Sequence, residues 1–218
     1  MKNFIENTEK ALIDSFIRQL IILAKKKRKL NKRFSFVLTG GKSPIHLYKK
    51  LSKAEIDWSN VDFFWGDERF VSKKSIYSNY NLAKKYFLKN IKINKKQVFS
   101  VNTEKNYNKS CKDYKKKIIK YFNYKKISFD LILLGMGEDG HIASIFSENI
   151  KKNKKNIIVK VIKSDFKRIS LSMKTINESK NIFLWLNNRK ITKIFKLLNK
   201  NQKKIPVYNL KKNKVSIF

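Results

Sequence analysis

The chain has 218 residues, of which 42% are hydrophobic and 13% aromatic, enough apolar material for the core of a globular domain. Six Gly and two Pro exclude collagen-like and other low-complexity architectures. The single cysteine, Cys111, excludes an internal disulfide framework and a zinc site built from cysteines. With only two His, a transition-metal site made by the protein alone is not expected.

The chain is strongly basic, with 52 Lys and Arg against 16 Asp and Glu and a net charge of +36. A polyanion such as DNA or RNA is the first partner that such a charge suggests. The lysines, however, occur in nearly every segment, Asn and Ile are abundant too, and codons rich in A and T encode all three. No helix-turn-helix, zinc-finger or RNP-type motif is present. We therefore expect no specific nucleic-acid partner, and a field that attracts small anionic substrates.

Nothing in the sequence predicts a membrane-spanning or an exported protein. The first residues, MKNFIENTEKAL, lack the apolar core of a signal peptide, and apolar runs such as Ile182–Leu186 are far too short to span a bilayer. With its lone cysteine, the chain is expected to be cytoplasmic, with no membrane partner, and a monomer or weak homodimer.

The hydrophobic spacing predicts helices and strands in alternation. The first helix covers residues 8–30, with Thr8 as its cap, and further helices are expected at 44–51, 78–89, 107–121 and 188–199. Strands are expected at 34–38, 61–65, 97–101, 129–135, 157–162, 168–173, 181–187, 206–210 and 214–217.

This alternation predicts an α/β fold with a Rossmann-like, mostly parallel sheet flanked by helices and built by right-handed crossovers. The run at 129–135 is continuously apolar, as expected for a central strand buried on both faces. No linker, repeat or second domain is evident, so residues 1–218 are expected to form a single domain. Ligands of such folds bind at the carboxyl ends of the parallel strands.

The first segment at such a strand end is Thr39–Pro44. Glycines let the backbone approach a ligand, Ser43 is a plausible N-cap, and Pro44 suits the first helical position. Amides at a helix start favour an anion such as phosphate, although a simple tight turn explains the same residues. The segment is not a P-loop, because that spacing requires glycine where Phe36 stands.

The second segment is Trp65–Arg69, in which two acids precede an arginine directly after a strand; a surface ion pair is the plain alternative. The third, Gly135–His141, matches the G-x-G-x-x-G spacing of dinucleotide-binding turns. Two acids inside the turn, and no acid about 20 residues further on, argue against that use. His141 beside Asp139 fits better as a general base, whereas His46 is interpreted as structural.

Together the three segments resemble the 6-phosphogluconolactonase family, within the glucosamine/galactosamine-6-phosphate isomerase superfamily. The resemblance covers about residues 34–210 and is carried by LTGGKSPIHLY, DWSNVDFFWGDERFV and FDLILLGMGEDGHIASIF, and more weakly by RISLSM and LNNRK. It implies a sugar-phosphate isomerase-like fold. It also implies hydrolysis of 6-phospho-D-glucono-1,5-lactone to 6-phospho-D-gluconate, a step of the oxidative pentose phosphate pathway, without a metal or organic cofactor.

The resemblance also implies roles for individual residues. His141 is expected to be the general base for attack of water on the lactone carbonyl, with Asp139 or Asp67 orienting its ring. The residues expected to bind the substrate, chiefly its phosphate, are Gly40, Gly41, Ser43, Arg69, Arg168 and Lys190. Because Asn187 stands where the family has a glycine before its lysine, Lys193 is an alternative to Lys190.

Two other functions remain open at this stage. An amino-sugar-6-phosphate isomerase/deaminase of the same fold carries an additional carboxylate shortly after the histidine, and here no acid occurs before Glu148. A non-catalytic sugar-phosphate-binding domain is the other alternative. Release of ammonia from glucosamine 6-phosphate favours the first, and full function after His141→Ala favours the second.

Overall fold

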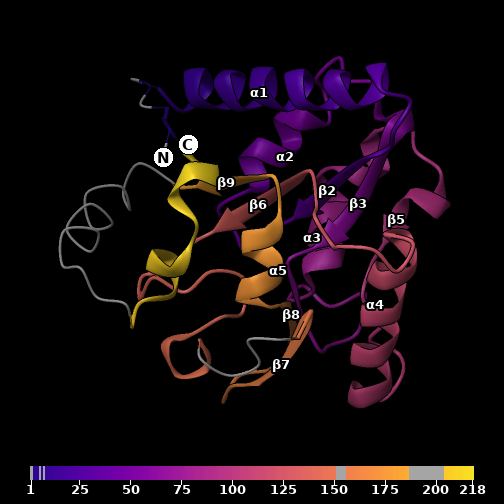
Figure 1. Cartoon of the computed structure of the whole chain (residues 1–218), viewed down its shortest axis with the longest axis vertical. Coiled ribbons are helices and arrows are strands. Elements are labelled where there is room, and N and C mark those ends of the chain that lie inside the picture. Colours follow the sequence, from indigo (N-terminus) through magenta and orange to yellow (C-terminus); the bar gives the residue numbers. More distant parts are fainter. Residues whose placement is uncertain (1, 5, 7, 151–155, 187–203) are drawn as a thin grey trace.

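The computed structural model describes residues 2–4, 6, 8–150, 156–186 and 204–218. In these residues the strands form a seven-stranded sheet, parallel throughout, and a separate three-stranded antiparallel sheet (Figure 1). The large sheet runs, in spatial order, through β1 (Lys2–Asn3), β10 (Val215–Ile217), β9 (Asn181–Trp185), β6 (Leu131–Gly135), β2 (Phe34–Leu38), β3 (Val61–Trp65) and β5 (Val98–Phe99). The small sheet comprises β4 (Asp67–Arg69), β8 (Lys167–Leu171) and β7 (Ile158–Ile162).

Helices cover both faces of the large sheet, which confirms the predicted α/β class. One face packs against α1 (Glu9–Lys29), α2 (Ile45–Leu51) and α3 (Asn79–Tyr86). The other face packs against α4 (Tyr107–Tyr121) and α5 (Met173–Glu178) (Figure 1). Short 3₁₀ turns occupy Trp58–Asn60, Leu88–Asn90, Lys95–Gln97, Ser147–Asn149, Pro206–Asn209 and Lys212–Lys214.

Strand β6 shows why the sheet needs two layers of helices. Leu131 and Leu133 point into the core under α1 and α2, whereas Ile132 and Leu134 point into the core under α4 and α5. All four side chains are fully buried, as the continuous apolar run predicted. Burial of each side chain contributes about 1.5–3 kcal/mol relative to exposure, so loss of either helical layer would strongly destabilise the fold.

Several predicted boundaries hold closely. Helix α1 begins where Thr8 accepts a hydrogen bond from the Ala11 amide, as expected for its N-cap. The strands predicted at 34–38 and 61–65 and the helix at 107–121 have the predicted bounds. The helix predicted at 78–89 ends at Tyr86, and the strand predicted at 97–101 is only Val98–Phe99, at the edge of the sheet.

The strands predicted at 157–162 and 168–173 are present as β7 and β8, and they pair antiparallel in the small sheet. Other expectations are wrong. The strand predicted at 206–210 is instead a 3₁₀ turn over Pro206–Asn209, in which Pro206 has no amide to donate to a strand. The helix Met173–Glu178, capped by Ser172, was not predicted, nor was the short strand Asp67–Arg69. The helix predicted at 188–199 lies outside the described residues.

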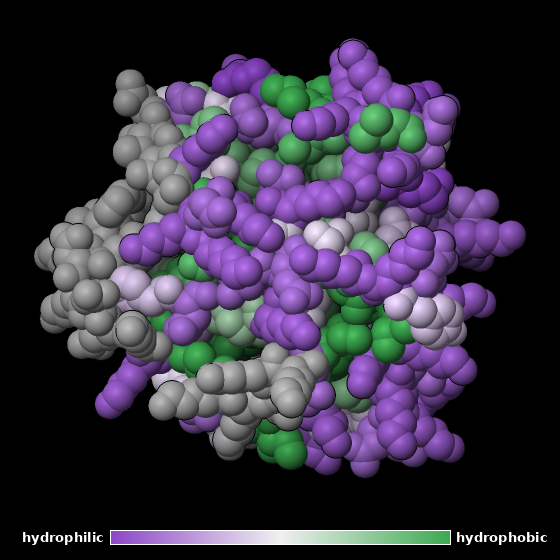
Figure 2. Space-filling view, viewed as in Figure 1, coloured by the Kyte–Doolittle hydropathy of each residue, from purple (hydrophilic) through white to green (hydrophobic). Residues whose placement is uncertain are grey.

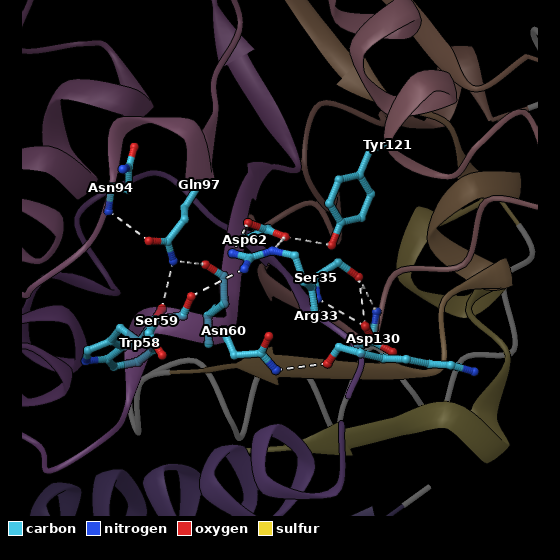
Figure 3. A network of polar contacts seen from close by, with 12 residues as sticks. Arg33, Ser35, Trp58, Ser59, Asn60, Asp62, Asn94, Gln97, Tyr121 and Asp130 are labelled. Atoms are coloured by element: carbon cyan, nitrogen blue, oxygen red, sulfur yellow. Dashed lines mark hydrogen bonds and ion pairs between the residues drawn. The ribbon is translucent and has the colours of Figure 1, made fainter. Parts of the chain in front are cut away.

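The amino-terminal edge of the parallel sheet is held by two buried carboxylates (Figure 3). Asp62 in β3 accepts hydrogen bonds from the Arg33 guanidinium (2.5 and 2.6 Å) and from the Tyr121 hydroxyl (3.0 Å). Asp130, just before β6, accepts from the Ser35 amide and hydroxyl, both at 3.0 Å. These contacts hold the amino ends of β2, β3 and β6 together, so that the carboxyl ends of the strands are free to form a site.

Hydrophilic residues cover most of the face seen in Figure 2, with smaller hydrophobic patches between them. Within the described ranges, no helix is long and apolar enough to cross a membrane.

We predict that Asp130→Asn destabilises the fold but leaves the residues at the carboxyl ends of the strands in place. One oxygen of Asp130 lies 2.9 Å from the Lys27 ammonium and 2.8 Å from that of Lys180. Removing the charge leaves both lysines without this partner, so the free energy of unfolding should fall by roughly 2 kcal/mol in a urea titration. The control is Asp113→Asn, which breaks only an exposed pair with Lys105 and should change stability little. Equal losses in the two variants would contradict the assignment.

Candidate active site

A cavity of about 650 Å³ opens at the carboxyl ends of β2 and β6, beside the small sheet. The three segments singled out in the sequence all contribute to its wall, although residues 45–64 and 70–134 separate each from the next. The wall is formed by Thr39, Gly40, Gly41, Lys42, Ser43, Asp67, Arg69, Gly135, Met136, Gly137, His141 and Arg168, with Glu9, Ile45, His46, Asn79 and Ala143 completing it.

His141 lies in this wall with one ring nitrogen bound to a carboxylate. Its Nδ1 is 2.5 Å from Oδ1 of Asp139, which also accepts a hydrogen bond from the His141 amide (3.2 Å). Burial opposes ionisation of Asp139, but these hydrogen bonds and the neighbouring imidazole outweigh it, and the pKa of Asp139 lies below its ordinary value. An ionised carboxylate on Nδ1 favours the tautomer that carries its proton there, which leaves the lone pair of Nε2 to act as a base.

Glycines make room for this imidazole. A Cβ on Gly137 would overlap Cε1 and Nδ1 of His141, so the ring lies directly against the backbone of residue 137. Gly140 has a φ of +78°, and a Cβ there would overlap Ile205. The glycine spacing that resembles a dinucleotide-binding turn therefore serves the placement of the histidine ring.

Asp67 does not orient the imidazole. Its side chain is buried and makes no hydrogen bond with His141; instead Oδ2 accepts from the Ser144 hydroxyl (2.6 Å) and Oδ1 from the Asn79 amide (3.2 Å). Of the two carboxylates that the sequence left open, the structure therefore places Asp139 on the ring. Asp67 is a separate fixed acceptor in the cavity wall.

The acid-acid-arginine triplet forms strand β4, in which successive side chains point to opposite faces of the small sheet. Asp67 and Arg69 face the cavity, whereas Glu68 points away and accepts hydrogen bonds at the start of α3 from the amides of Asn79 (2.7 Å) and Tyr80 (2.8 Å). Burial raises the pKa of Glu68 to about 7, with the charge of Asp67 adding to the shift and the amide hydrogen bonds opposing it.

Arg69 and Arg168 lie directly opposite each other in the antiparallel pair of β4 and β8. Opposed side chains of such a pair share one face of the sheet, and both arginines line the cavity. Arg168 forms an ion pair with Asp165, whereas no carboxylate in the described ranges pairs with Arg69. The Nε atoms of both are buried without a hydrogen-bond partner within the same ranges. Two like charges so placed are unfavourable alone and favour an anion between them.

The loop Gly40–Ser43 forms another part of the wall. Gly41 has a φ of +81°, a left-handed conformation that favours glycine, and a Cβ on Gly40 would overlap the amide of Asn79. Ser43 is not the N-cap that the sequence suggested: α2 begins at Ile45 after Pro44, with no side-chain cap. The predicted anion site at this helix start thus loses two of its supports, the cap by Ser43 and the place of Pro44 as the first helical residue.

His46, interpreted as structural, proves to line the cavity, where its Nδ1 lies 3.1 Å from Oε2 of Glu9. Lys190, its alternative Lys193, and Asn187 lie outside the described residues. Among the residues that are described, no group of three His, Cys, Asp or Glu could hold a metal ion.

Asn79 and Ser144 were missed as site residues. Both are almost completely buried and both hold Asp67, yet neither residue type stands out in a sequence rich in Asn and Ser. The one available signal was position: Asn79 follows the helix cap Ser78, and Ser144 lies three residues after His141.

Comparison with known proteins places the chain in a family. The family model described as "Glucosamine-6-phosphate isomerases/6-phosphogluconolactonase" matches residues 7–218, and the chain belongs to this family. It is similar to the 6-phosphogluconolactonase of Thermotoga maritima, with 29% identity over 90% of this chain and 89% of that protein. It is also similar to the 6-phosphogluconolactonase of Haemophilus influenzae, with 30% identity over 80% and 75%.

Solved structures agree with this fold. The crystal structure of the Thermotoga maritima 6-phosphogluconolactonase superposes with a TM-score of 0.85 at 25% identity, covering 99% of this chain and 97% of that one. The 6-phosphogluconolactonase of Trypanosoma cruzi has the same fold, with a TM-score of 0.83 over 99% and 92% of the two chains.

We predict that Glu68 makes the fold less stable as the pH rises. A carboxyl group whose pKa is raised to about 7 in the folded state contributes stability that is complete below its unfolded pKa, near 4.5, and is lost as the pH rises through 7. The loss between pH 5 and pH 8 should approach roughly 3 kcal/mol. Urea titrations across this range should show a fall in unfolding free energy that Glu68→Gln flattens. The quantity compared is the slope of the unfolding free energy against pH, so a constant difference in stability between the variant and the wild type does not matter. Equal slopes for the two proteins would contradict the prediction.

Proposed function

We propose that the chain hydrolyses 6-phospho-D-glucono-1,5-lactone to 6-phospho-D-gluconate, a step of the oxidative pentose phosphate pathway. The observation that carries this proposal is one cavity whose wall holds both an imidazole with a carboxylate on Nδ1 and two arginines at directly paired positions of neighbouring strands. A base and an anion site in the same cavity suit a substrate with a reactive ester at one end and a phosphate at the other.

The chemistry at the ester needs one base that can return its proton. Nε2 of His141 takes a proton from a water molecule as the water oxygen attacks the lactone carbonyl carbon, and the imidazolium then gives that proton to the departing ring oxygen. The product is the open-chain acid. Asp139 keeps the ring oriented. One positioned base contributes about 10²–10⁴-fold, and a lactone is already labile, so the mechanism uses no metal ion or organic cofactor.

The phosphate is assigned to Arg69 and Arg168. A guanidinium binds phosphate through parallel charge-assisted hydrogen bonds, each of about 1.5–3 kcal/mol. An anion between the two opposed side chains also offsets their mutual repulsion. Holding the phosphate there fixes the carbonyl carbon relative to His141, which lowers the barrier by positioning.

The remaining residues of the cavity complete this proposal. Gly40, Gly41 and Ser43 line the cavity and stay proposed substrate contacts. Lys190, with Lys193 as its alternative, stays a proposed phosphate contact outside the described residues. Asp67, held by Ser144 and Asn79, is a fixed acceptor for a hydroxyl group or for the attacking water. A single domain over residues 1–218, a cytoplasmic location and a monomer or weak homodimer stay predictions.

We predict that the chain releases no ammonia from glucosamine 6-phosphate. In residues 142–147, which follow the histidine, the only side chain that lines the cavity is that of Ala143, which offers no carboxylate for ring opening. A coupled ammonia assay should stay at background under conditions in which the lactone is hydrolysed. Ammonia release at a rate comparable to lactone hydrolysis would reverse the assignment.

We predict that Gly137→Ala reduces kcat for lactone hydrolysis by about 10²-fold, because the new methyl group displaces the imidazole. The matched control is Gly66→Ala, where a Cβ finds its nearest neighbour, the Leu38 carbonyl oxygen, at an ordinary 3.6 Å. That variant should keep kcat within about twofold. Hydrolysis is followed as proton release above the spontaneous rate. Equal effects of the two substitutions would contradict this placement of His141.

A further inference from the structure

One aromatic ring contacts both functional ends of the proposed site. The Phe146 ring centroid lies 4.6 Å from that of His141, with the two planes 38° apart, and 5.6 Å from Cζ of Arg168. The Lys163 ammonium lies 4.3 Å from the same centroid. Phe146 is itself only 6% exposed and does not line the cavity.

The imidazole needs this contact because its other restraints leave it free to rotate. Asp139 holds a single atom of the ring, Nδ1, and a single hydrogen bond permits tilting about its own axis. Gly137 limits the ring on the side of its backbone but presents no side chain to hold it. The Phe146 ring supplies a further surface, and aromatic pairs of this kind stabilise a defined ring geometry beyond the effect of burial.

The same ring restrains the guanidinium of Arg168. That group forms an ion pair with Asp165 and lies over the rings of Phe146 and Phe166, with Cζ 5.6 and 5.9 Å from their centroids. Its Nε has no hydrogen-bond partner in the described chain, so stacking is a large part of what fixes its plane.

Phe146 is anchored independently of the cavity. Its side chain packs with Val159 and Val161 of β7 in a small cluster of its own. Its amide donates to Oδ1 of Asn149 (2.8 Å), whose side-chain nitrogen donates to the Ser144 carbonyl (3.3 Å). The ring is therefore fixed to the small sheet that also carries Arg168.

We propose that Phe146 is a positioning residue that sets the proposed base, His141, and the proposed phosphate ligand, Arg168, at a fixed separation by contacting both. This inference rests on the proposed function. It follows that removing the ring impairs turnover and phosphate binding together, since misplacement by about 1 Å costs up to 10²-fold in rate.

The test compares Phe146→Met, which keeps the volume but removes the ring, with Phe146→Tyr, which keeps the ring. The control is Phe129→Met, a fully buried phenylalanine at the opposite edge of the sheet. We expect Phe146→Met to lower kcat about tenfold or more and to weaken binding of inorganic phosphate at least threefold. Phe146→Tyr should stay within about threefold of wild type in both, and Phe129→Met should lose only thermal stability. Loss of stability alone in Phe146→Met, or equal losses in Met and Tyr, would overturn the proposal.

Two further readouts separate this proposal from the proposed function. Phosphate affinity requires no turnover, so a wild-type protein that binds phosphate but leaves the lactone intact would refute the lactonase assignment and still allow the Met variant to decide the role of Phe146. In wild-type NMR spectra, nuclear Overhauser effects are expected between the ring protons of His141 and Phe146. Their absence would overturn the proposal even where the Met variant fails to fold.

Discussion

The antiparallel pairing of β4 with β8 is the constraint on which the site depends. Trp65 makes the last residue pair of β3 in the parallel sheet, the Gly66 amide still donates to the Leu38 carbonyl, and the chain then continues as β4 into a different sheet. That change of partner brings Arg168, almost one hundred residues away in sequence, directly opposite Arg69. It also places Asp67 where Ser144 can reach it. The parallel sheet alone would supply the glycine loops and the histidine but not the two arginines of the proposed anion site.

In the parallel sheet, the amino ends of the strands carry buried contacts that stabilise the fold, whereas the carboxyl ends carry the candidate active site. Buried Asp62 and Asp130 fasten the strand starts, each satisfied by cations and hydrogen bonds from neighbouring elements. At the carboxyl edge the carboxylate of Asp67 has only neutral donors, and Arg69 has no carboxylate partner within the described residues. Charges left without opposite partners inside a cavity are unfavourable for the empty protein and are where a charged substrate gains most.

Much of the fold could be predicted because burial on two faces leaves a readable pattern. The apolar runs 34–38 and 61–65 have no polar alternation, and they are indeed buried strands. Strand β4 could not be found this way, since its three residues are all charged and its pairing is set by a distant partner. The direction of β7 and β8 is likewise a tertiary property, because their alternation fits parallel and antiparallel pairing equally well.

The site was predictable where local chain geometry creates it. His141 and Asp139 are two residues apart, and their contact lies within one turn. Asp67 was an equal candidate because sequence spacing does not reveal that Ser144 and Asn79 occupy its oxygens. Phe146 was hidden among sixteen phenylalanines, most of which belong to the core. What sequence reasoning lacked in each case was the identity of a neighbour brought in by folding.

The most direct measurement is lactone hydrolysis, followed as proton release above the spontaneous rate, for the wild type and for His141→Ala, together with binding of 6-phosphogluconate to both. We expect rapid hydrolysis by the wild type, a loss of at least 10²-fold in kcat in the variant, and product affinity that changes little, since we assign the phosphate to Arg69 and Arg168. A variant that hydrolyses the lactone as fast as the wild type would contradict this expectation.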